Sequence, residues 1–205
     1  MTAIKFLLVI LAGYLLGSIS FSIWLSKMLG MDIRRKGSGN AGATNMARSF
    51  GLPAGFATLA GDFLKAAVVM FVAYRLCGNW GLMAGGAACI TGHCFPIFYD
   101  FRGGKGISVG AAIGLAIDWR VFVGIVIVFL IAAFLSKKVS LGSICAAVAV
   151  ILLSLVFAVP LPRLLLAIYA AALAIFQHRA NIRRLFAGEE PDFRAAKQGK
   201  DGAEP

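Results

Sequence analysis

Long apolar blocks, separated by short basic stretches, constrain the fold of this 205-residue chain more than any other feature. The first block runs from Phe6 to Ser26 without a charge, which is longer than the apolar core of a secretory signal, and a polar motif rather than a cleavage site follows it. About 20 apolar residues in a helix cross the hydrocarbon core of a bilayer. The pattern therefore predicts an all-α, polytopic membrane helical bundle whose first block is retained.

Six blocks have the length of a transmembrane helix, and a seventh, residues 107–117, is short. The short block is either a span of its own or the start of one helix over 106–136. Lys and Arg gather on the cytoplasmic side of membrane proteins, and only seven spans keep Lys137, Lys138 and the basic C-terminal stretch on the side of the other basic loops. We therefore predict seven transmembrane helices, with the N-terminus outside and the C-terminus inside. The predicted spans cover residues 4–29, 53–76, 79–98, 107–117, 121–136, 139–159 and 161–178.

Composition bounds the domain organisation and the partners. Residues 1–190 form one transmembrane domain, and we expect the polar tail, residues 191–205, to be disordered because it has little apolar surface to bury. The net charge of +11 follows from the positive-inside rule, whereas nucleic-acid binders carry such charge on a water-soluble surface, so we expect no nucleic acid partner. The four cysteines contain no C-x-x-C pair, which argues against a zinc site or a disulfide framework.

Three polar, glycine-rich segments fall on the predicted inner face. The first runs from Gly37 to Asn45 and is followed by Arg48. Glycines allow backbone N–H groups to converge on an anion, and hydroxyl, amide and guanidinium groups add donors to it. We favour an oxyanion site over a flexible loop. The candidate binding residues are Gly37, Ser38, Gly39, Asn40, Gly42, Thr44, Asn45 and Arg48.

The second segment, residues 92–106, precedes the short fourth span. Glycines and a lysine before a helix N-terminus favour a bound anion, because free N–H groups and the helix dipole both attract negative charge. Gly106, rather than Ser or Thr, follows Lys105, so the segment is not a nucleotide-binding P-loop. His93 is as compatible with packing as with a site. The candidates are His93, Gly103, Gly104 and Lys105.

The third segment begins at the inner end of the last span. His178 and Asn181 are three residues apart and share one helical face, with Glu189 nearby. A Gly/Ser turn before the sixth span adds Ser143 to the same side. No metal-ligand cluster and no Ser–His–Asp spacing accompany these residues, so we expect neither a metal nor another cofactor.

Two further features lie inside the spans. Asp62 and Lys65 are one helical turn apart, which predicts a structural ion pair facing the bundle interior, with a role in the site as the alternative. Three pairs of glycines four residues apart predict close helix packing. These pairs are Gly13 and Gly17, Gly81 and Gly85, and Gly110 and Gly114.

Together the ordered motifs resemble the bacterial acyl-phosphate:glycerol-3-phosphate acyltransferase family over about residues 5–190. The resemblance implies transfer of a fatty acyl group from acyl phosphate to the 1-hydroxyl of sn-glycerol 3-phosphate. The products would be 1-acyl-sn-glycerol 3-phosphate (lysophosphatidic acid) and phosphate, in phospholipid biosynthesis at the bacterial cytoplasmic (inner) membrane, with the active site on the cytoplasmic face. The motifs are Gly37-Ser-Gly-Asn-x-Gly-Ala-Thr-Asn45 with Arg48, Gly92-His-x-Phe-Pro96 with Gly103-Gly-Lys-Gly106, Ser140-Leu-Gly-Ser143, and His178-x-x-Asn181.

The resemblance also implies roles for residues. Ser38, Arg48 and Lys105 would bind the phosphate of glycerol 3-phosphate, whereas Ser143, His178 and Asn181 would face acyl phosphate. His178, Lys105 and Asn181 are the catalytic candidates. Acyl phosphate is an activated mixed anhydride, so positioning and charge stabilisation suffice without a covalent nucleophile. The proton acceptor is either His178 or the phosphate of the donor.

Two other function classes remain as alternatives. An acyl-CoA-dependent acyltransferase would use an H-x-x-x-x-D pair, but Phe98 and Arg183 stand five residues after the two histidines. An organophosphate transporter would need polar groups through the membrane thickness, and here they gather on one predicted face. The expected partners are thus the two substrates and membrane lipid, and no protein partner follows from the sequence.

Overall fold

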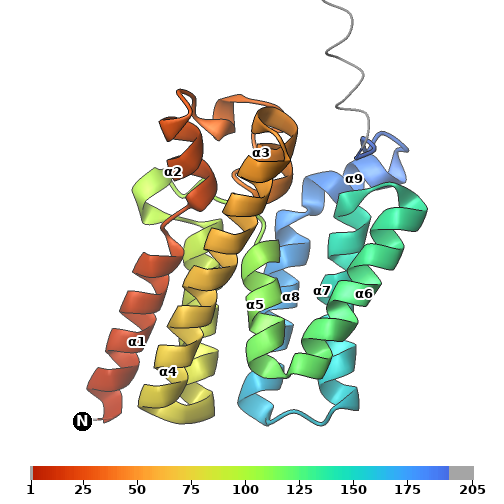
Figure 1. The fold of residues 1–205 in the computed structure, drawn as a ribbon. Coiled ribbons are helices and arrows are strands. Elements are labelled where there is room, and N and C mark those ends of the chain that lie inside the picture. The colour runs from red at the N-terminus through yellow and green to blue at the C-terminus, as the bar shows by residue number, and fades with distance from the viewer. Residues whose placement is uncertain (1, 194–205) are drawn as a thin grey trace, which may run out of the picture.

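A computed structural model describes residues 2–193, and its regular elements are helices. The long helices run side by side along one direction, with the short helices α2, α3 and α9 at one end of the bundle and the N-terminus at the other (Figure 1). Helix α1 (Thr2–Gly17) and helix α2 (Phe21–Met28) share the first apolar block. Ser20 separates them and caps α2, because its hydroxyl accepts a hydrogen bond from the Ile23 amide at 3.4 Å.

Helix α4 (Leu52–Cys94) contains both the second and the third predicted spans. It folds back on itself at Cys77 and Gly78, where the backbone leaves the helical region and Gly78 takes a φ of +59°. A Cβ at Gly81 would overlap the carbonyl group of Ala73 on the facing arm. Figure 1 shows the two arms, residues 52–76 and 79–94, side by side.

Helix α5 (Ile107–Ile117) has the predicted bounds and ends at Asp118, where the chain reverses into α6 (Trp119–Ser136) (Figure 1). The Asp118 carboxylate starts α6 by accepting a hydrogen bond from the Arg120 amide at 2.8 Å. A single helix over 106–136 is therefore wrong. At about 1.5 Å per residue α5 is about 16 Å long, which is roughly half the thickness of the hydrocarbon core.

The remaining long helices are α7 (Val139–Val156) and α8 (Leu161–Gln177), and α9 (Arg179–Phe186) bends away from α8 by 59°. Among the described residues, four helical segments are long and apolar enough to cross a membrane, and α8 with α9 makes a fifth when they count as one bent span. This count takes the folded α4 as one segment and leaves out the short α5. The chain is thus an all-helical integral membrane protein.

Two of the predicted glycine pairs are sites of close packing. A Cβ at Gly17 of α1 would overlap the backbone of Cys89 in α4, and a Cβ at Gly92 would overlap the carbonyl oxygen of Tyr14. Gly81 and Gly85 lie against the facing arm of α4. Gly110, in contrast, has no atom within 4 Å of the position of a Cβ. In the third pair, therefore, only Gly114 is a site of close packing.

The C-terminal residues of the described chain fold back on the turn between α6 and α7. The Phe193 amide donates to the Lys137 carbonyl at 2.9 Å, and Lys138 pairs with Asp192 at 3.1 Å. These contacts hold residues 191–193, the beginning of the predicted tail, against the bundle. The rest of that tail, residues 194–205, lies outside the described residues.

Candidate active site

A polar cavity of about 160 Å³ lies at the end of the bundle that carries α3 and α9. The segments that form it are far apart in the sequence: the 37–45 loop with α3 (Ala43–Phe50), both arms of α4, the start of α5, the start of α7 and the C-terminal residues. The structure thus brings the first two predicted polar segments and Ser143 to one cavity, and Asn181 of the third segment reaches it by accepting a hydrogen bond from Lys105. The predicted site residues that line the polar cavity are Ser38, Asn40, Gly42, Thr44, Asn45, Arg48, His93, Lys105 and Ser143.

Asn45 orders the first loop rather than offering a free donor. Its side-chain nitrogen donates to the carbonyls of Ile33, Lys36 and Asn40 at 3.3, 2.9 and 3.0 Å, and its side-chain oxygen accepts from the Ser38 amide at 3.1 Å. Gly37 takes a φ of +60°, and a Cβ there would overlap the Asn45 amide. Gly37 and Gly39 lie outside the cavity lining and serve the shape of the loop.

Arg48 faces the polar cavity from α3, one turn after Thr44. Its Nε is buried and has no hydrogen-bond partner among the described residues. Buried polar groups in native proteins are paired with few exceptions, and a guanidinium presents a fork of donors suited to phosphate. Arg48 is therefore placed to receive an anion.

The glycines of the second segment allow close packing against the end of α4 and do not offer free amides to a ligand. The amides of Gly103 and Gly104 donate to the carbonyls of Cys94 and His93 at 3.2 and 3.1 Å, so they are not free for a ligand. A Cβ at Gly104 would overlap the His93 ring, and one at Gly103 would overlap the His93 carbonyl. The close approach of this loop to the end of α4 thus requires glycine at both positions, and it carries Lys105 to the cavity.

Lys105 belongs to a chain of hydrogen bonds that reaches Glu190. Its ammonium donates to the side-chain oxygen of Asn181. The Asn181 side-chain nitrogen donates to Glu190 at 2.6 Å, and Arg184 donates to the other oxygen of Glu190 at 2.7 Å. Burial lowers the pKa of the Lys105 ammonium to about 8, with Arg184 and Arg48 acting in the same direction and Glu190 opposing. Asn181 itself stays outside the cavity lining and orients Lys105.

His178 is buried at the junction of α8 and α9, outside the cavity lining. Its Nδ1 lies 2.7 Å from the carbonyl oxygen of Ala174. A carbonyl can only accept, so Nδ1 carries the proton and Nε2 of the neutral ring is left as an acceptor.

Asp62 joins the polar cavity from inside the bundle. Its side chain is 1% exposed and pairs with Lys65 at 2.7 Å, as the sequence predicts for a structural ion pair. Asp62 also lines the cavity together with His93, so the alternative of a role in the site has geometric support.

Sequence reasoning missed Ser140 and Glu190 as site residues, although both line the polar cavity. It favoured Glu189, which is exposed, whereas Glu190 is 6% exposed and bonded to Asn181. Burial would raise the pKa of the Glu190 carboxyl, but hydrogen bonds from its neighbours hold it below its ordinary value. The sequence does not distinguish two adjacent glutamates in a turn, because the path of the backbone decides which of the two side chains is buried.

The buried side-chain atoms without a hydrogen-bond partner in the described part of the chain are Arg48 Nε, both Asp62 oxygens and Ser140 Oγ. Lys65 compensates one Asp62 oxygen by charge. All three residues line the polar cavity. Unpaired polar atoms of both signs, gathered at one cavity, indicate a polar ligand with acceptors and donors of its own.

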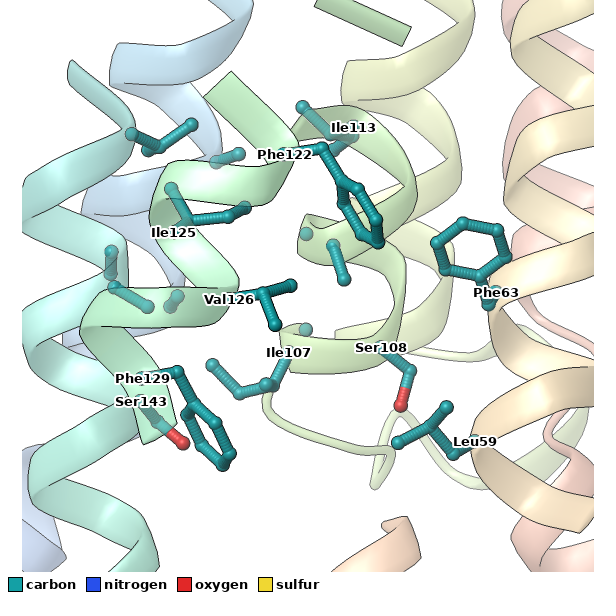
Figure 2. Close-up of a pocket in the computed structure, with 18 of the residues that line it drawn as sticks. Leu59, Phe63, Ile107, Ser108, Ile113, Phe122, Ile125, Val126, Phe129 and Ser143 are labelled. Carbon is teal, nitrogen blue, oxygen red and sulfur yellow. The ribbon is translucent and has the colours of Figure 1, made fainter. Parts of the chain in front are cut away.

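An apolar groove of about 590 Å³ adjoins the polar cavity and runs between α4, α5, α6 and α7. Figure 2 shows Phe122 and Val126 of α6 facing Phe63 of α4, with α5 beside them. Phe129, Ser108, Ser143 and Leu59 lie together at one end of the groove (Figure 2). The mouth, defined as the residues that line both spaces, consists of Leu59, Ile107, Ser108, Phe129 and Ser143.

The polar cavity and the apolar groove suit chemically different parts of a ligand. The polar cavity carries Arg48 and Lys105 and suits phosphate, whereas the apolar groove is lined by hydrocarbon and suits an acyl chain. The mouth, where Ser108 and Ser143 add hydroxyl groups, is the place at which the polar and apolar parts of substrates meet.

Comparison with known proteins gives a consistent result. The sequence profile of the glycerol-3-phosphate acyltransferase family matches residues 7–188. The glycerol-3-phosphate acyltransferase of Aquifex aeolicus is 37% identical over 191 residues, which cover 92% of this chain and all of the relative. That of Trichlorobacter lovleyi is 40% identical over 188 residues, 91% of this chain and 96% of the relative.

Solved structures agree with the sequence matches. The crystal structure of PlsY, an integral membrane glycerol 3-phosphate acyltransferase, in its glycerol 3-phosphate form superposes with a TM-score of 0.90 at 35% identity, covering 96% of this chain and 99% of that one. Its lysophosphatidic acid form gives a TM-score of 0.86 at 36% identity, with coverages of 91% and 94%. The chain therefore belongs to the glycerol-3-phosphate acyltransferase family and is an integral membrane enzyme of phospholipid biosynthesis.

Proposed function

We propose that the enzyme transfers a fatty acyl group from acyl phosphate to the 1-hydroxyl of sn-glycerol 3-phosphate, giving 1-acyl-sn-glycerol 3-phosphate and inorganic phosphate. The observation that carries the proposal is the set of unpaired buried atoms of Arg48, Asp62 and Ser140 in one cavity that opens at the mouth onto an apolar groove. Acyl phosphate and glycerol 3-phosphate together need such a pair of spaces, because both carry phosphate and one carries a long hydrocarbon chain.

The proposed roles follow from position. Arg48 and Lys105 hold phosphate by charge, with hydroxyl and amide donors from Ser38, Asn40 and Thr44 beside them. Ser143 lies at the mouth, where the acyl carbonyl would sit. Asn181 acts on Lys105 through its side-chain oxygen. Gly37, Gly39, Gly103 and Gly104 shape the two loops and make no direct contact with substrate.

The chemical step needs no activated nucleophile in the protein. The 1-hydroxyl oxygen attacks the carbonyl carbon, the bond from that carbon to the phosphate oxygen breaks, and phosphate leaves with the bonding electrons. Lys105 and Arg48 stabilise the charge that develops on the departing phosphate. The hydroxyl proton passes to a phosphate oxygen of the donor. His178 is the alternative acceptor, and its Nε2 is free for the purpose.

We also propose that the chain crosses the bilayer seven times, with the site on the cytoplasmic face of the bacterial inner membrane. The two arms of α4 count as two spans and the short α5 as one. The ends marked by Gly78, Asp118 and Pro160 then face outside, and the polar cavity faces the cytoplasm, where the basic loops lie. Residues 1–190 act as a single domain in this proposal, followed by the polar tail.

A donor comparison tests the proposal. Purified enzyme receives glycerol 3-phosphate with either palmitoyl phosphate or palmitoyl-CoA, and the acylated product is measured. We expect product with palmitoyl phosphate alone. Product formed only with palmitoyl-CoA would contradict the proposed donor while leaving the acceptor in place.

A further inference from the structure

We infer that Asp62 recognises the 2-hydroxyl group of glycerol 3-phosphate, the hydroxyl that is not acylated. The inference rests on the proposed function of the polar cavity and deepens it. It assigns a substrate contact to a residue that would otherwise be only half of an ion pair. The juxtaposition that carries it is a buried carboxylate without a hydrogen-bond partner among the described residues, in the wall of a cavity that also presents Arg48 and Lys105. The other carboxylate of that wall, Glu190, is bonded to Asn181 and Arg184.

The ion pair with Lys65 does not account for the whole carboxylate. An ammonium has three donors. Lys65 lies 2.7 Å from Asp62 Oδ1 as an ion pair, but its hydrogen bonds go to the Ile19 carbonyl at 2.5 Å and to His93 Nδ1 at 3.3 Å. Lys65 thus compensates Asp62 by charge at Oδ1, and neither oxygen of Asp62 has a hydrogen-bond partner in the described part of the chain.

His93 does not supply the missing donor. Its Nδ1 faces the Lys65 ammonium, which can only donate, so Nδ1 is the acceptor and the ring proton of the neutral imidazole lies on Nε2. The distance from Nδ1 to Asp62 Oδ1 is 3.6 Å, which is beyond hydrogen-bond length. Nε2 points to Gly104, where any Cβ would overlap it. The imidazole therefore positions Lys65 and leaves Asp62 Oδ2 open.

An open carboxylate oxygen selects for a donor on the ligand, because a carboxylate can only accept. The doubly ionised phosphate group of an acyl phosphate carries no N–H or O–H donor. Glycerol 3-phosphate carries two hydroxyl groups, so it satisfies the phosphate-binding wall with one end and Asp62 with the other. Lys65 neutralises the carboxylate at 2.7 Å, which removes the repulsion that a free carboxylate would exert on the phosphate.

Position decides between the two hydroxyl groups. The attacking hydroxyl must lie against the acyl carbonyl at the mouth, where the apolar groove meets the polar cavity. Asp62 lines the polar cavity and not the groove, whereas Leu59, one helical turn away on α4, lines both. Asp62 thus lies on the polar side of the mouth, where the 2-hydroxyl and not the 1-hydroxyl would be.

Binding of two acceptors, measured by titration calorimetry on the purified full-length chain without any acyl donor, tests the inference. The acceptors are glycerol 3-phosphate and 3-hydroxypropyl phosphate, which lacks only the 2-hydroxyl. A hydrogen bond to a charged group implies that the wild-type enzyme binds glycerol 3-phosphate at least about tenfold more tightly. Equal binding of the two would overturn the inference and leave Oδ2 bonded to water only.

Variants separate recognition from folding. In Asp62→Ala we expect the ratio of the two dissociation constants to fall to within about threefold, and in Asp62→Asn, which keeps an amide oxygen, to an intermediate value. Lys65→Met is the matched control, because it breaks the same ion pair but keeps the carboxylate and so keeps the preference. A wild-type ratio retained in Asp62→Ala would contradict the inference.

The ratio of the two dissociation constants does not depend on the folded fraction, because both acceptors are measured with the same protein preparation. If a lone buried Lys65 prevents Asp62→Ala from folding, the double variant Asp62→Ala with Lys65→Met removes both charges and must likewise lose the preference. The assay contains no acyl donor, so an error in the proposed donor leaves this result intact and would show only in the donor comparison.

Discussion

Lys105 is the residue whose chemistry depends most on its surroundings. Its ammonium is buried, bonded to Asn181 and close to Arg48 and Arg184, which lowers its pKa to about 8. A lysine of ordinary pKa would stay charged throughout the physiological range. Lys105 therefore loses its charge at a lower pH than an ordinary lysine does.

Glycerol 3-phosphate binding should weaken above about pH 8. The charged form of Lys105 exists below its pKa, and only that form attracts phosphate, so KM for glycerol 3-phosphate should rise with pH through that value. Lys105→Arg keeps its charge to about pH 12, so in this variant the rise in KM should move to higher pH. Steady-state kinetics between pH 6 and 10 measure both. If KM rises at the same pH in the arginine variant, the ionisation of another group causes the rise.

Removing either phosphate-binding cation should slow the reaction. Lys105→Ala and Arg48→Ala each delete a charge-assisted contact worth about 1.5–3 kcal/mol, so kcat/KM for glycerol 3-phosphate should fall at least about tenfold. Lys5→Ala is the control and should retain full activity, because Lys5 lies in the first turn of α1 and the N-terminus of α1 is at the opposite end of the bundle (Figure 1). Wild-type kinetics in the Arg48 variant would remove Arg48 from the site.

The pH profile of a His178 variant distinguishes the two proton acceptors. Because His178 lies outside the lining of the polar cavity, we expect His178→Ala to keep the acidic limb of the wild-type profile, which then reports the ionisation of substrate phosphate. Loss of that limb would identify His178 as the general base. Full activity with an unchanged profile would exclude His178 from the reaction.

At the scale of elements, α5 is unusual because it is short and contains an unpacked glycine. Gly110 lines the apolar groove and has no atom within 4 Å of a Cβ position. Its helical neighbour Gly114 is instead packed against Ile125. The two glycines of this pair therefore have different roles: Gly114 lets α5 and α6 approach each other closely, whereas Gly110 leaves room in the apolar groove.

Filling that room should change the preferred chain length. In Gly110→Phe the ring should exclude part of a long acyl chain. Each methylene kept out of the groove forfeits about 0.8 kcal/mol, so two cost about tenfold in kcat/KM. We expect the loss with palmitoyl phosphate to exceed that with octanoyl phosphate, with KM for glycerol 3-phosphate little changed. Equal losses with both donors would show that the groove does not hold the chain.

Close packing of α1 on α4 should be far less tolerant. In Gly92→Val the added carbons would overlap the carbonyl of Tyr14, and backbone has to move to relieve the overlap. Overpacking of this kind costs about 1–3 kcal/mol. We expect a lower midpoint of thermal unfolding in detergent, whereas Gly110→Ala, the matched control in open space, should unfold at or above the wild-type temperature.

For the whole molecule, the proposed seven-span arrangement predicts an accessibility pattern. In a cysteine-free background of intact cells, single cysteines near Asp118 and Pro160 should react with a membrane-impermeant reagent. Cysteines in residues 38–45 and 179–184 should be shielded until the membrane is opened. Labelling of the Lys137–Lys138 turn from outside would contradict the topology and a cytoplasmic site.

The reaction as a whole should proceed without a metal. In the proposed reaction the donor is already activated, and Lys105 and Arg48 would supply the charge that a divalent ion would otherwise give. We expect acyl transfer from palmitoyl phosphate to survive EDTA. Activity lost with the chelator and restored by a divalent cation would contradict this.

The sequence by itself determined the class of the molecule and most of its elements. Apolar blocks of sufficient length specify helices in lipid, because every backbone N–H and C=O group must find its partner inside the helix. Hydropathy therefore predicted α6, α7 and α8 to within a few residues. Hydropathy left α5 open as a span of its own or the start of a longer helix, and the distribution of Lys and Arg decided for a separate helix that ends before Asp118. Local motifs also predicted which polar segments gather at one end.

The tertiary structure alone decided which polar groups are free to act. Asn45 and the amides of Gly103 and Gly104 look like donors in the sequence, but they are spent on backbone carbonyls that folding brings to them. Lys105 donates to Asn181, which in turn donates to Glu190, and the sequence separation between Lys105 and Asn181 is one that no local pattern encodes. A hydrogen bond depends on atomic positions within a few tenths of an ångström. Sequence spacing gives residue types, whereas only the packed bundle shows which atoms remain unpaired and so bind substrate.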